Sequence, residues 1–243
     1  MNIVSFSGGK DSTAMLLRMI ELNYQIDKVV FADTTLEYPE MYDWINKIDK
    51  IVKEKIGINI ERTYPSHSFD EHFYGCFTKG KLKGRRRGFP LRKPQPCYWT
   101  LYGKKYPTRK AHGKNNIIYM GIAVDEKKRT KSKIYQKQKN KYKFPLVEWN
   151  WTEQDCYNYL LNKKLPHPFR KIRTGCWLCP NHSIKTLKML YNNYPKLWKK
   201  LKQYEADSPQ GFKPNLKLKD IEYKVKQEKR QKTINDFKDE RIN

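Results

Sequence analysis

The chain has 243 residues, and its 51 Lys and Arg against 25 Asp and Glu give a formal net charge of +26. This length suffices for one α/β domain with a smaller appendage, and a 14% share of aromatic residues favours a folded chain over a disordered one. No apolar run reaches the roughly 18–20 residues of a membrane span, and no secretory signal opens the chain. We therefore expect a cytoplasmic protein, without a membrane partner, whose cysteines are thiols or metal ligands.

The positive charge is concentrated in one segment. Residues 79–143 carry 22 Lys and Arg but only two carboxylates, Asp125 and Glu126. A lysine-rich solvated surface would explain this charge, but aromatic residues interleave with it, which favours binding of nucleic acid.

Apolar periodicity predicts alternating strands and helices along the chain. Strands are expected at residues 3–6, 29–32, 58–64, 117–120 and, as a short edge element, 144–146; helices are expected at 12–22, 39–55, 152–162 and 183–204. The strand–helix–strand–helix–strand order of the first 64 residues predicts a parallel sheet with right-handed crossovers.

A proline pair, Pro166 and Pro168, predicts a domain boundary. We expect an α/β domain over residues 1–165, with a basic insertion at about 70–115. A C-terminal region with a C-x-x-C motif and helices would cover residues 166–243. Its tail from residue 213 alternates in charge, which predicts a solvated helix or partial disorder.

A glycine pair directly follows the first expected strand and opens the first expected helix. Glycines let backbone N–H groups approach an anion, and the helix N-terminus adds a partial positive charge. The segment does not match the Walker A pattern. Lys10 can neutralise phosphate oxygens, and Asp11 can hold Mg²⁺ or cap the helix. The alternative is a glycine turn with Ser12 as the helix cap.

The stretch "SGGKDS" after an N-terminal strand resembles the PP-loop of the adenine nucleotide α-hydrolase superfamily. The resemblance implies a doubly wound, Rossmann-like α/β fold and an enzyme that cleaves ATP between the α and β phosphates to adenylate a substrate. It also implies that the pyrophosphate is bound by Ser7, Gly8, Gly9, Lys10, Asp11 and Ser12.

Two further stretches resemble the phosphoadenylyl sulfate (PAPS) reductase branch of that superfamily. "FADTTLEYPEMYDW" is similar to the branch's DTGxxxPE segment, with Thr35 where the branch usually has glycine; Asp33 would then contact ribose or Mg²⁺, or else cap a helix. "GIAVDEKKR" is similar to a Gly–Asp–Glu–Arg stretch that would border the α-phosphate through Gly121, Asp125, Glu126 and Arg129. The alternative is that these carboxylates pair with neighbouring lysines.

The resemblance continues through "FPLVEWNWTEQDCYNYLLNKKLPHP", which is similar to the branch's "PL–W–[DE]V–YI–LP–P" pattern, and covers roughly residues 1–182. We expect a catalytic set of Lys10, Asp11, Asp125, Glu126 and Arg129.

Three cysteines have metal-ligand spacing. Cys176 and Cys179 form a C-x-x-C pair, and Cys97 lies 79 residues before Cys176. The iron–sulfur reductases of the branch are similar but have two adjacent cysteines at the earlier position. Three cysteines can hold a [4Fe–4S] cluster with one open iron, which resembles the PP-loop thiolation enzymes.

Two other residues are candidates for a fourth ligand, Cys76 and His182. Full protein ligation would favour a structural Zn²⁺ site instead, and free thiols are a third alternative. Cys156 falls within an amphipathic helix, where core packing is expected. The other histidines have no metal-motif spacing and are assigned no role.

The sequence predicts an ATP-dependent PP-loop enzyme that adenylates an acceptor, tRNA or DNA, for sulfur transfer. A cysteine desulfurase is a candidate sulfur donor, and a homodimer is a candidate assembly. Sulfonucleotide (APS or PAPS) reduction ranks second, because assimilatory PAPS reductases resemble one another in a C-terminal catalytic cysteine and no cysteine follows Cys179 here. A non-catalytic nucleic-acid-binding protein with structural zinc ranks third.

Overall fold

The computed structural model describes residues 1–89, 97–169 and 175–239. The chain forms two compact units, each described here by itself: Met1–Ser66 with Tyr98–Cys176, and His67–Cys97 with Trp177–Asn243. This division differs from the predicted boundary after residue 165, because the first unit runs on to Cys176 and residues 67–97, which include the first part of the predicted insertion, belong to the second unit.

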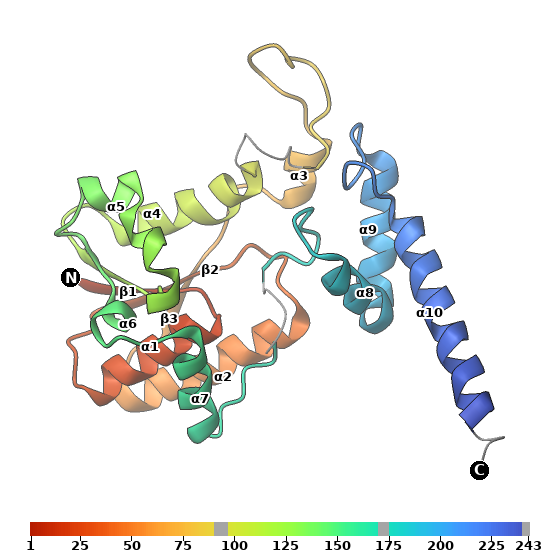
Figure 1. The fold of residues 1–243 in the computed structure, drawn as a ribbon. Coiled ribbons are helices and arrows are strands. Elements are labelled where there is room, and N and C mark those ends of the chain that lie inside the picture. Colours follow the sequence, from red (N-terminus) through yellow and green to blue (C-terminus); the bar gives the residue numbers. More distant parts are fainter. Residues whose placement is uncertain (90–96, 170–174, 240–243) are drawn as a thin grey trace. The chain divides into compact units, whose positions relative to one another are not determined.

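The first unit is built from parallel strands with helices on both faces (Figure 1). Its strands are β1 (Asn2–Phe6), β2 (Lys28–Ala32), β3 (Ile60–Thr63), β4 (Ile117–Met120) and β5 (Tyr142–Lys143). Its helices are α1 (Lys10–Glu21), α2 (Pro39–Ile56), α4 (Tyr106–His112), α5 (Lys133–Lys137), α6 (Pro145–Glu148) and α7 (Glu153–Asn162), with a π-helical turn η1 (Thr100–Lys105) and a 3₁₀ helix η2 (Val124–Lys131).

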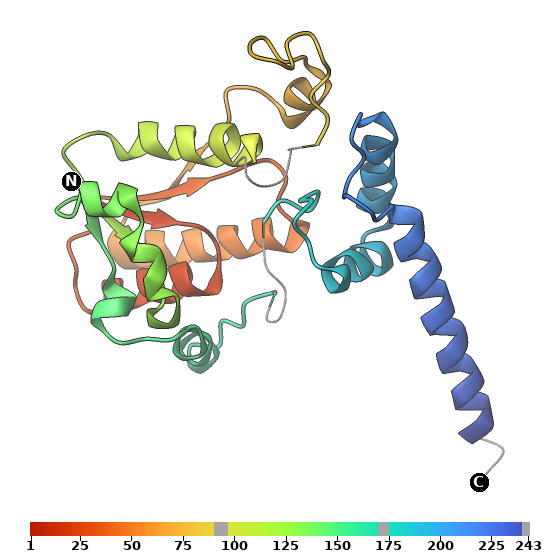
Figure 2. The ribbon, with the colours of Figure 1, turned by 45° about the horizontal axis from the view of Figure 1, so that its top comes forward.

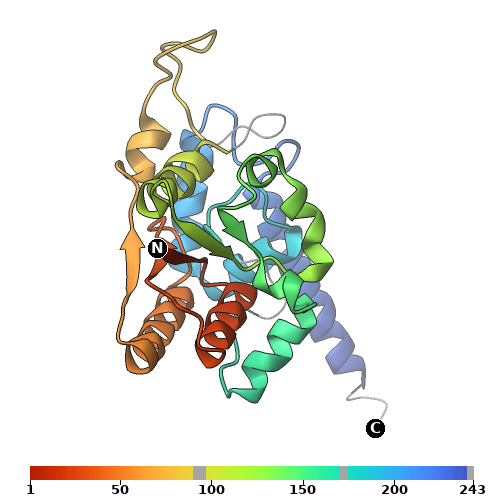
Figure 3. The same ribbon diagram turned by 90° about the vertical axis from the view of Figure 1, so that its left-hand side faces the viewer.

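The five strands form one sheet in the order β3-β2-β1-β4-β5, and every neighbouring pair is parallel. Helices α1, α2 and α7 cover one face and α4 the other (Figure 3). This arrangement confirms the predicted doubly wound fold. The strand order reverses between β1 and β4, and in such sheets the crevice beyond the strand ends at the reversal is where ligands bind.

The packing of α2 shows why the sequence folds this way. Its apolar residues at helical spacing, Met41, Ile45, Ile48 and Val52, are all buried. Pro39 fits the first turn, where its missing N–H has no intrahelical role, and Gly57 ends the helix in the left-handed conformation at φ 76°.

Two expected boundaries differ in the first unit. The predicted edge strand at residues 144–146 is wrong: β5 is formed by the two residues before it, and Pro145 opens helix α6. Proline cannot donate to a strand ladder, and its fixed φ suits a first helical turn. Helix α1 begins at Lys10 with Gly9 as N-cap, so Ser12 lies inside the helix and is not its cap.

The second unit contains α3 (Phe69–Tyr74), α8 (Ile184–Asn193), α9 (Pro195–Asp207) and α10 (Leu218–Asp239). The single helix predicted for residues 183–204 is wrong, because Tyr194 leaves helical geometry before Pro195, at φ −132° and ψ 66°, and separates α8 from α9. A residue before proline is pushed away from helical geometry. The predicted charged tail forms α10 (Figure 2), which packs against α8 and is tied to α9 by a hydrogen bond that Trp198 Nε1 donates to Glu222 at 2.7 Å.

An aromatic cluster holds the two segments of the second unit together. The ring of Phe73 lies 4.8 Å from that of Tyr204 and 5.2 Å from that of Phe89, which in turn lies 4.9 Å from Phe212. Aromatic pairs at such separations stabilise beyond their buried area. Residues 67–89 therefore share a core with residues 177 onward.

Candidate nucleotide site at the ends of β1 and β4

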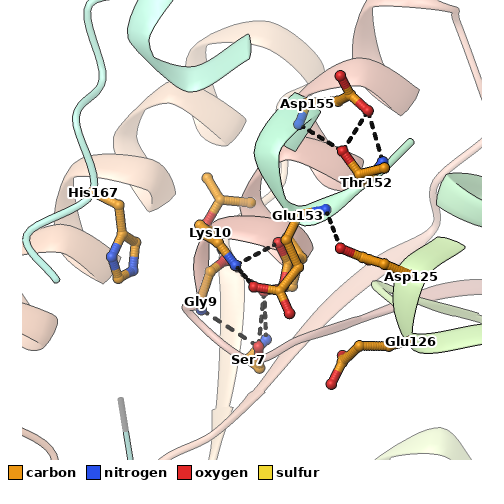
Figure 4. A network of polar contacts seen from close by, with 12 residues as sticks. Ser7, Gly9, Lys10, Asp125, Glu126, Thr152, Glu153, Asp155 and His167 are labelled. Carbon is orange, nitrogen blue, oxygen red and sulfur yellow. Dashed lines mark hydrogen bonds and ion pairs between the residues drawn. The ribbon is translucent and has the colours of Figure 1, made fainter. Parts of the chain in front are cut away.

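Residues 7–9 connect β1 to α1 at the reversal of strand order, and Figure 4 shows Ser7 and Gly9 of this loop below Lys10. No side chain caps α1, whose N-cap is Gly9. The first turn of a helix leaves backbone N–H groups without intrahelical partners, and the helix dipole makes this end positive. The geometry is that of an anion site at the carboxyl edge of a parallel sheet.

Two glycines are required here by space and conformation. Gly8 has φ +76°, and a Cβ there would meet Met41 Cε of α2 at 3.0 Å. A Cβ on Gly121, just after β4, would lie 2.7 Å from Ser12 Cα. A larger residue at position 121 would push α1 away from the sheet, and one at position 8 would have to adopt a left-handed backbone. Both glycines therefore set the shape of the site.

Hydroxyl groups brace the loop from within. Ser7 Oγ and Ser12 Oγ lie 2.9 Å apart, and Ser12 Oγ also donates to the carbonyl of Gly9 at 3.0 Å. Thr13 Oγ1 donates to the same carbonyl at 2.9 Å. Ser12 and Thr13 are buried while Ser7 is exposed, so Ser7 alone of these three offers its side chain to a ligand.

Lys10 is held between two carboxylates. Its Nζ lies 3.2 Å from Asp11 Oδ1 and forms an ion pair with Glu153 of α7. Burial lowers the pKa of Lys10, but the hydrogen bond that Lys10 donates to Glu153 and the charge of Asp11 outweigh it, so the pKa is raised. Burial raises the pKa of Asp11 to about 6 against the opposing effect of Lys10, and the nearby charges of Glu153 and Glu126 raise it further.

The predicted carboxylates of η2 lie on the same side of the loop as Glu153 (Figure 4). Asp125 Oδ2 accepts a hydrogen bond from the backbone N–H of Glu153 at 3.2 Å, and so stabilises the N-terminus of α7. Glu126 pairs with Arg129 within η2. The structure thus brings Asp125 and Glu126 to Lys10 and Asp11, while Arg129 is engaged by Glu126 and its side chain is 59% exposed.

Asp33 lies at the carboxyl end of β2, the strand next to β1, but its oxygens already have partners. Oδ1 accepts from the backbone N–H of Thr35 at 2.8 Å and from the hydroxyl of Tyr42 at 3.1 Å, and Oδ2 lies 3.6 Å from Arg62. The residue is only 3% exposed. In this structure Asp33 acts as the anchor of a turn.

Two residues of the site were assigned no role from the sequence, Glu153 and His167. His167 is buried, donates from Nε2 to the carbonyl of Gly8 at 3.0 Å and accepts the backbone N–H of Phe169 at Nδ1 at 3.1 Å. Its ring lies edge-on to Trp44, with centroids 5.1 Å apart. Burial lowers its pKa, which keeps the neutral tautomer that these hydrogen bonds require.

The sequence feature that could have identified these two residues is their position in the stretch that resembles the family pattern. Glu153 stands in the first turn after the Thr152 cap, and His167 stands between two prolines. Neither position has a spacing that identifies a ligand-binding residue by itself.

The predicted metal ligands belong to different units: Cys176 closes the chain of the first, whereas Cys76, Cys97 and Cys179 lie in the second. Cys97, Cys176 and Cys179 are partly exposed, Cys76 is exposed, and Cys156 is fully buried as expected for core packing. Among the residues that the structure describes, no three His, Cys, Asp or Glu side chains form a metal site. The ligand set therefore stays a prediction.

A buried polar chain reaches Cys176 within the first unit. The thiol donates to Thr34 Oγ1 at 3.6 Å, and Thr34 Oγ1 donates to Glu37 Oε1 at 3.0 Å. Glu37, only 6% exposed, lies 3.3 Å from Lys104 Nζ. The segment after β2 thus orients a cysteine, a role that sequence reasoning did not assign to Thr34.

Comparison with known proteins gives a family match over most of the chain. Residues 1–182 match the family model described as the phosphoadenosine phosphosulfate reductase domain. A solved PAPS reductase from Candida auris, in a phosphate complex, superposes with a TM-score of 0.42 at 17% identity, over 69% of this chain and 75% of that one.

Two curated relatives are uncharacterised proteins of Methanocaldococcus jannaschii. One is 28% identical over 212 residues, which is 82% of this chain and 40% of the relative. The other is 25% identical over 246 aligned residues, which is 93% of this chain and 54% of the relative. The chain thus spans about half of the length of these relatives. Within the described ranges, no helix is long and apolar enough to cross a membrane.

Proposed function

The chain belongs to the phosphoadenosine phosphosulfate reductase domain family, and from that premise we propose that it is an ATP-dependent enzyme that adenylates an acceptor for sulfur transfer. Members of such families are generally enzymes that bind adenine nucleotides. We further propose that the acceptor is a nucleic acid.

The observation that carries the proposal is the anion site between β1 and β4. Uncapped N–H groups of α1, the left-handed backbone at Gly8 and the ammonium of Lys10 meet at the strand-order reversal. Such a site suits the phosphates of a nucleotide. Lys10 would exchange its pairing with Glu153 for phosphate oxygens when the nucleotide binds.

Carboxylates beside a phosphate site repel the bound anion, so their presence there requires an explanation. Mg²⁺ commonly uses one or two carboxylates together with substrate phosphates. Asp11 in the first turn of α1 and Glu126 in the first turn of η2 are the carboxylates that we propose for this role. When bound there, Mg²⁺ would neutralise phosphate charge.

In the proposed reaction an oxygen of the acceptor attacks the α-phosphorus of ATP. The new O–P bond forms as the bond to the β-phosphate oxygen breaks, and that electron pair leaves with pyrophosphate. Sulfide supplied by a donor then forms a C–S bond, and the C–O bond breaks with the oxygen leaving in AMP. The protein's part in the first step is positioning and charge neutralisation, which are the main contributions in phosphoryl transfer.

Cys97, Cys176 and Cys179 would hold the cofactor that this chemistry uses, a [4Fe–4S] cluster, or Zn²⁺ in a purely structural role. Their thiols are all partly exposed, and Cys176 is oriented by Thr34, which suits thiolate ligands. Iron, zinc and acid-labile sulfide measured in protein purified without oxygen would decide: about four irons support the cluster, and one zinc without iron contradicts it.

Nucleic acid as acceptor is supported by the charge of +26 and by the basic segment at residues 79–143. Replacing Arg85, Arg86 and Arg87 with alanine should weaken binding and flatten its salt dependence by roughly 0.7–0.9 per lost phosphate contact. An unchanged salt slope would remove these arginines from the binding surface.

Pyrophosphate release from ATP, with and without RNA or DNA, tests the reaction. Lys10→Ala should abolish release, because its ammonium lies at the helix end of the loop, where phosphate charge must be neutralised. Lys163→Ala removes an ion pair with Glu21 at the other end of α1 and should leave release unchanged. No release under any condition would contradict adenylation and favour a nucleic-acid-binding protein with structural zinc.

The family match favours sulfonucleotide reduction as a second candidate. Sulfite release from APS or PAPS in the presence of a thiol reductant, without ATP, would distinguish the two reactions. Sulfite release without any ATP-dependent pyrophosphate release would replace the first proposal with the second.

A further inference from the structure

A cavity of about 270 Å³ lies beside β5, apart from the PP-loop. We call it the β5 pocket; its principal lining residues are Tyr135, Gln136, Lys139, Tyr142, Lys143 and Phe144. They come from α5, from β5 and from the residues that flank these elements. None of the predicted site residues lines this cavity.

The aromatic side chains of the β5 pocket support one another. The ring of Tyr135 lies 4.8 Å from that of Tyr142 at an angle of 68°, and 5.3 Å from that of Phe144 at 75°. Edge-to-face contacts of this kind fix ring orientation. All three side chains are partly exposed, so the cluster keeps aromatic surface available to a ligand.

The charge around the pocket is positive. Residues 127–143 include nine Lys and Arg and no Asp or Glu. Lys139 and Lys143 line the cavity and are exposed, and Glu148 is the carboxylate of its lining. Rigid aromatic surface combined with a surplus of lysines is the chemistry that binds bases and phosphates together.

The size of the cavity limits the ligand. Small-molecule sites have volumes of roughly 300–1,000 Å³, so a cavity of about 270 Å³ has room for one base with part of its sugar. A duplex keeps its bases stacked inside, whereas a single strand can present one base to an aromatic surface.

We propose that the β5 pocket binds one unstacked nucleotide of a single-stranded nucleic acid. The base packs on Tyr135, and the flanking phosphates contact Lys139 and Lys143. This binding site rests on the proposed function only in that the ligand is a nucleic acid, and it requires no catalysis.

The pocket is connected to the candidate nucleotide site through η2. Asp125 and Glu126 lie at the start of this eight-residue helix, and Thr130 near its end lines the pocket. Gln136 Nε2 donates to the carbonyl of Thr130 at 3.2 Å and ties α5 to η2. A strand held in the pocket therefore lies on the same short element as the carboxylates near Lys10.

The test is direct binding of fluorescein-labelled 12-nucleotide oligouridine and oligoadenosine, with a duplex of equal length, by the full chain in the absence of ATP. Tyr135→Leu should weaken single-strand binding about 5- to 100-fold with an unchanged salt slope, because a stacking surface is lost but no charge. Tyr135→Phe keeps the ring and should bind as the wild type does.

Charge is tested separately. Lys139→Gln with Lys143→Gln should reduce the salt slope by about 1.4, from two lost contacts to a single strand. Tyr64→Leu and the pair Lys53→Gln, Lys55→Gln are matched controls, because Tyr64 follows β3 at the opposite edge of the sheet and both lysines are exposed on α2. Neither control should change binding.

Cross-linking of a 4-thiouridine oligonucleotide, located by mass spectrometry, should fall on the peptide that contains Tyr135 or Tyr142. The proposal is overturned if Tyr135→Leu binds single strands like the wild type, or weakens duplex binding equally. It is also overturned if Tyr135→Leu weakens binding of the protein to vesicles containing phosphatidylserine but leaves its binding to oligonucleotides unchanged. Because no ATP is present, failure of adenylation would leave these outcomes unchanged.

Discussion

At the scale of single residues, Thr35 has the least favourable backbone of the site. It follows the anchored Asp33 with φ 61°, in the left-handed region that strongly disfavours β-branched residues. Thr35→Gly should therefore raise the free energy of unfolding by about 1 kcal/mol, the left-handed cost minus the entropy that glycine adds to the unfolded chain. Urea denaturation measures the change.

Thr130→Gly is the matched control for that substitution. Thr130 lies in η2 and is not among the residues with positive φ, so glycine there should destabilise the protein. If both substitutions lower stability alike, the left-handed backbone at Thr35 carries no strain.

His167 acts on the PP-loop through one hydrogen bond. The hydrogen bond from Nε2 to the carbonyl of Gly8 fixes the orientation of that carbonyl group in the loop, where Gly8 has φ +76°. His167→Ala should weaken ATP binding about tenfold, as expected for a lost buried hydrogen bond of roughly 1.5 kcal/mol. His167→Gln places an amide N–H near the same point and should restore most of the affinity in isothermal titration calorimetry. A loss of stability with unchanged ATP affinity would make His167 merely structural.

At the scale of elements, an ion pair connects the N-terminus of α7 to the N-terminus of α1. The Glu153 carboxylate forms an ion pair with Lys10, and the backbone N–H of Glu153 donates a hydrogen bond to Asp125. Without Mg²⁺, Glu153→Gln should bind ATP about 3- to 10-fold more tightly, because a half-exposed carboxylate beside the phosphate site is neutralised and Lys10 is released. Glu21→Gln, which removes a carboxylate paired with Lys163 at the far end of α1, should leave the affinity unchanged.

The outcome for Glu153→Gln is informative in both directions. Tighter binding in EDTA confirms that the ion pair competes with phosphate. Weaker binding would mean that Glu153 holds the nucleotide directly, and the pairing with Lys10 would then be a secondary feature.

The elements with clear local signals were predictable from the sequence. The β4 range was expected at residues 117–120 and is Ile117–Met120, because a β-branched apolar run ends at a glycine. The capping box of Thr152 and Asp155 marks the start of α7 in the same way. By contrast, Pro145 and Pro195 changed the expected elements around them, since a missing N–H outweighs apolar pattern.

The candidate site was predictable only where its residues are close in the chain. The glycine pair and Lys10 form one short segment, so their joint role follows from spacing. Glu153 and His167 reach the loop across 143 and 159 residues, and only the fold brings them there. Asp33 shows the reverse: its place at a strand end was expected, but its bonds to Thr35, Tyr42 and Arg62 could not be read from sequence.

At the scale of the whole molecule, two buried groups give opposite dependences of stability on pH. Burial lowers the pKa of His112 to about 4 from 6.5, and the charges of Lys141 and Lys28 act in the same direction. Between these values the unfolded chain binds a proton that the folded chain refuses, so stability falls as the pH falls. Asp11, raised from 3.8 to about 6, holds its proton in the folded state and adds stability as the pH falls through that range.

Single variants should separate the two contributions, each worth about 2–3 kcal/mol between pH 6.5 and 4. Relative to the wild type, Asp11→Asn should become more acid-labile by that amount and His112→Phe less acid-labile, in urea denaturation without Mg²⁺ or nucleotide. Parallel curves for Asp11→Asn and the wild type would show that the Asp11 carboxylate ionises in the folded protein as it does in the unfolded chain. In that case the Asp11 carboxylate beside Lys10 would be charged over this whole pH range, and a cation would be needed to offset its repulsion of phosphate.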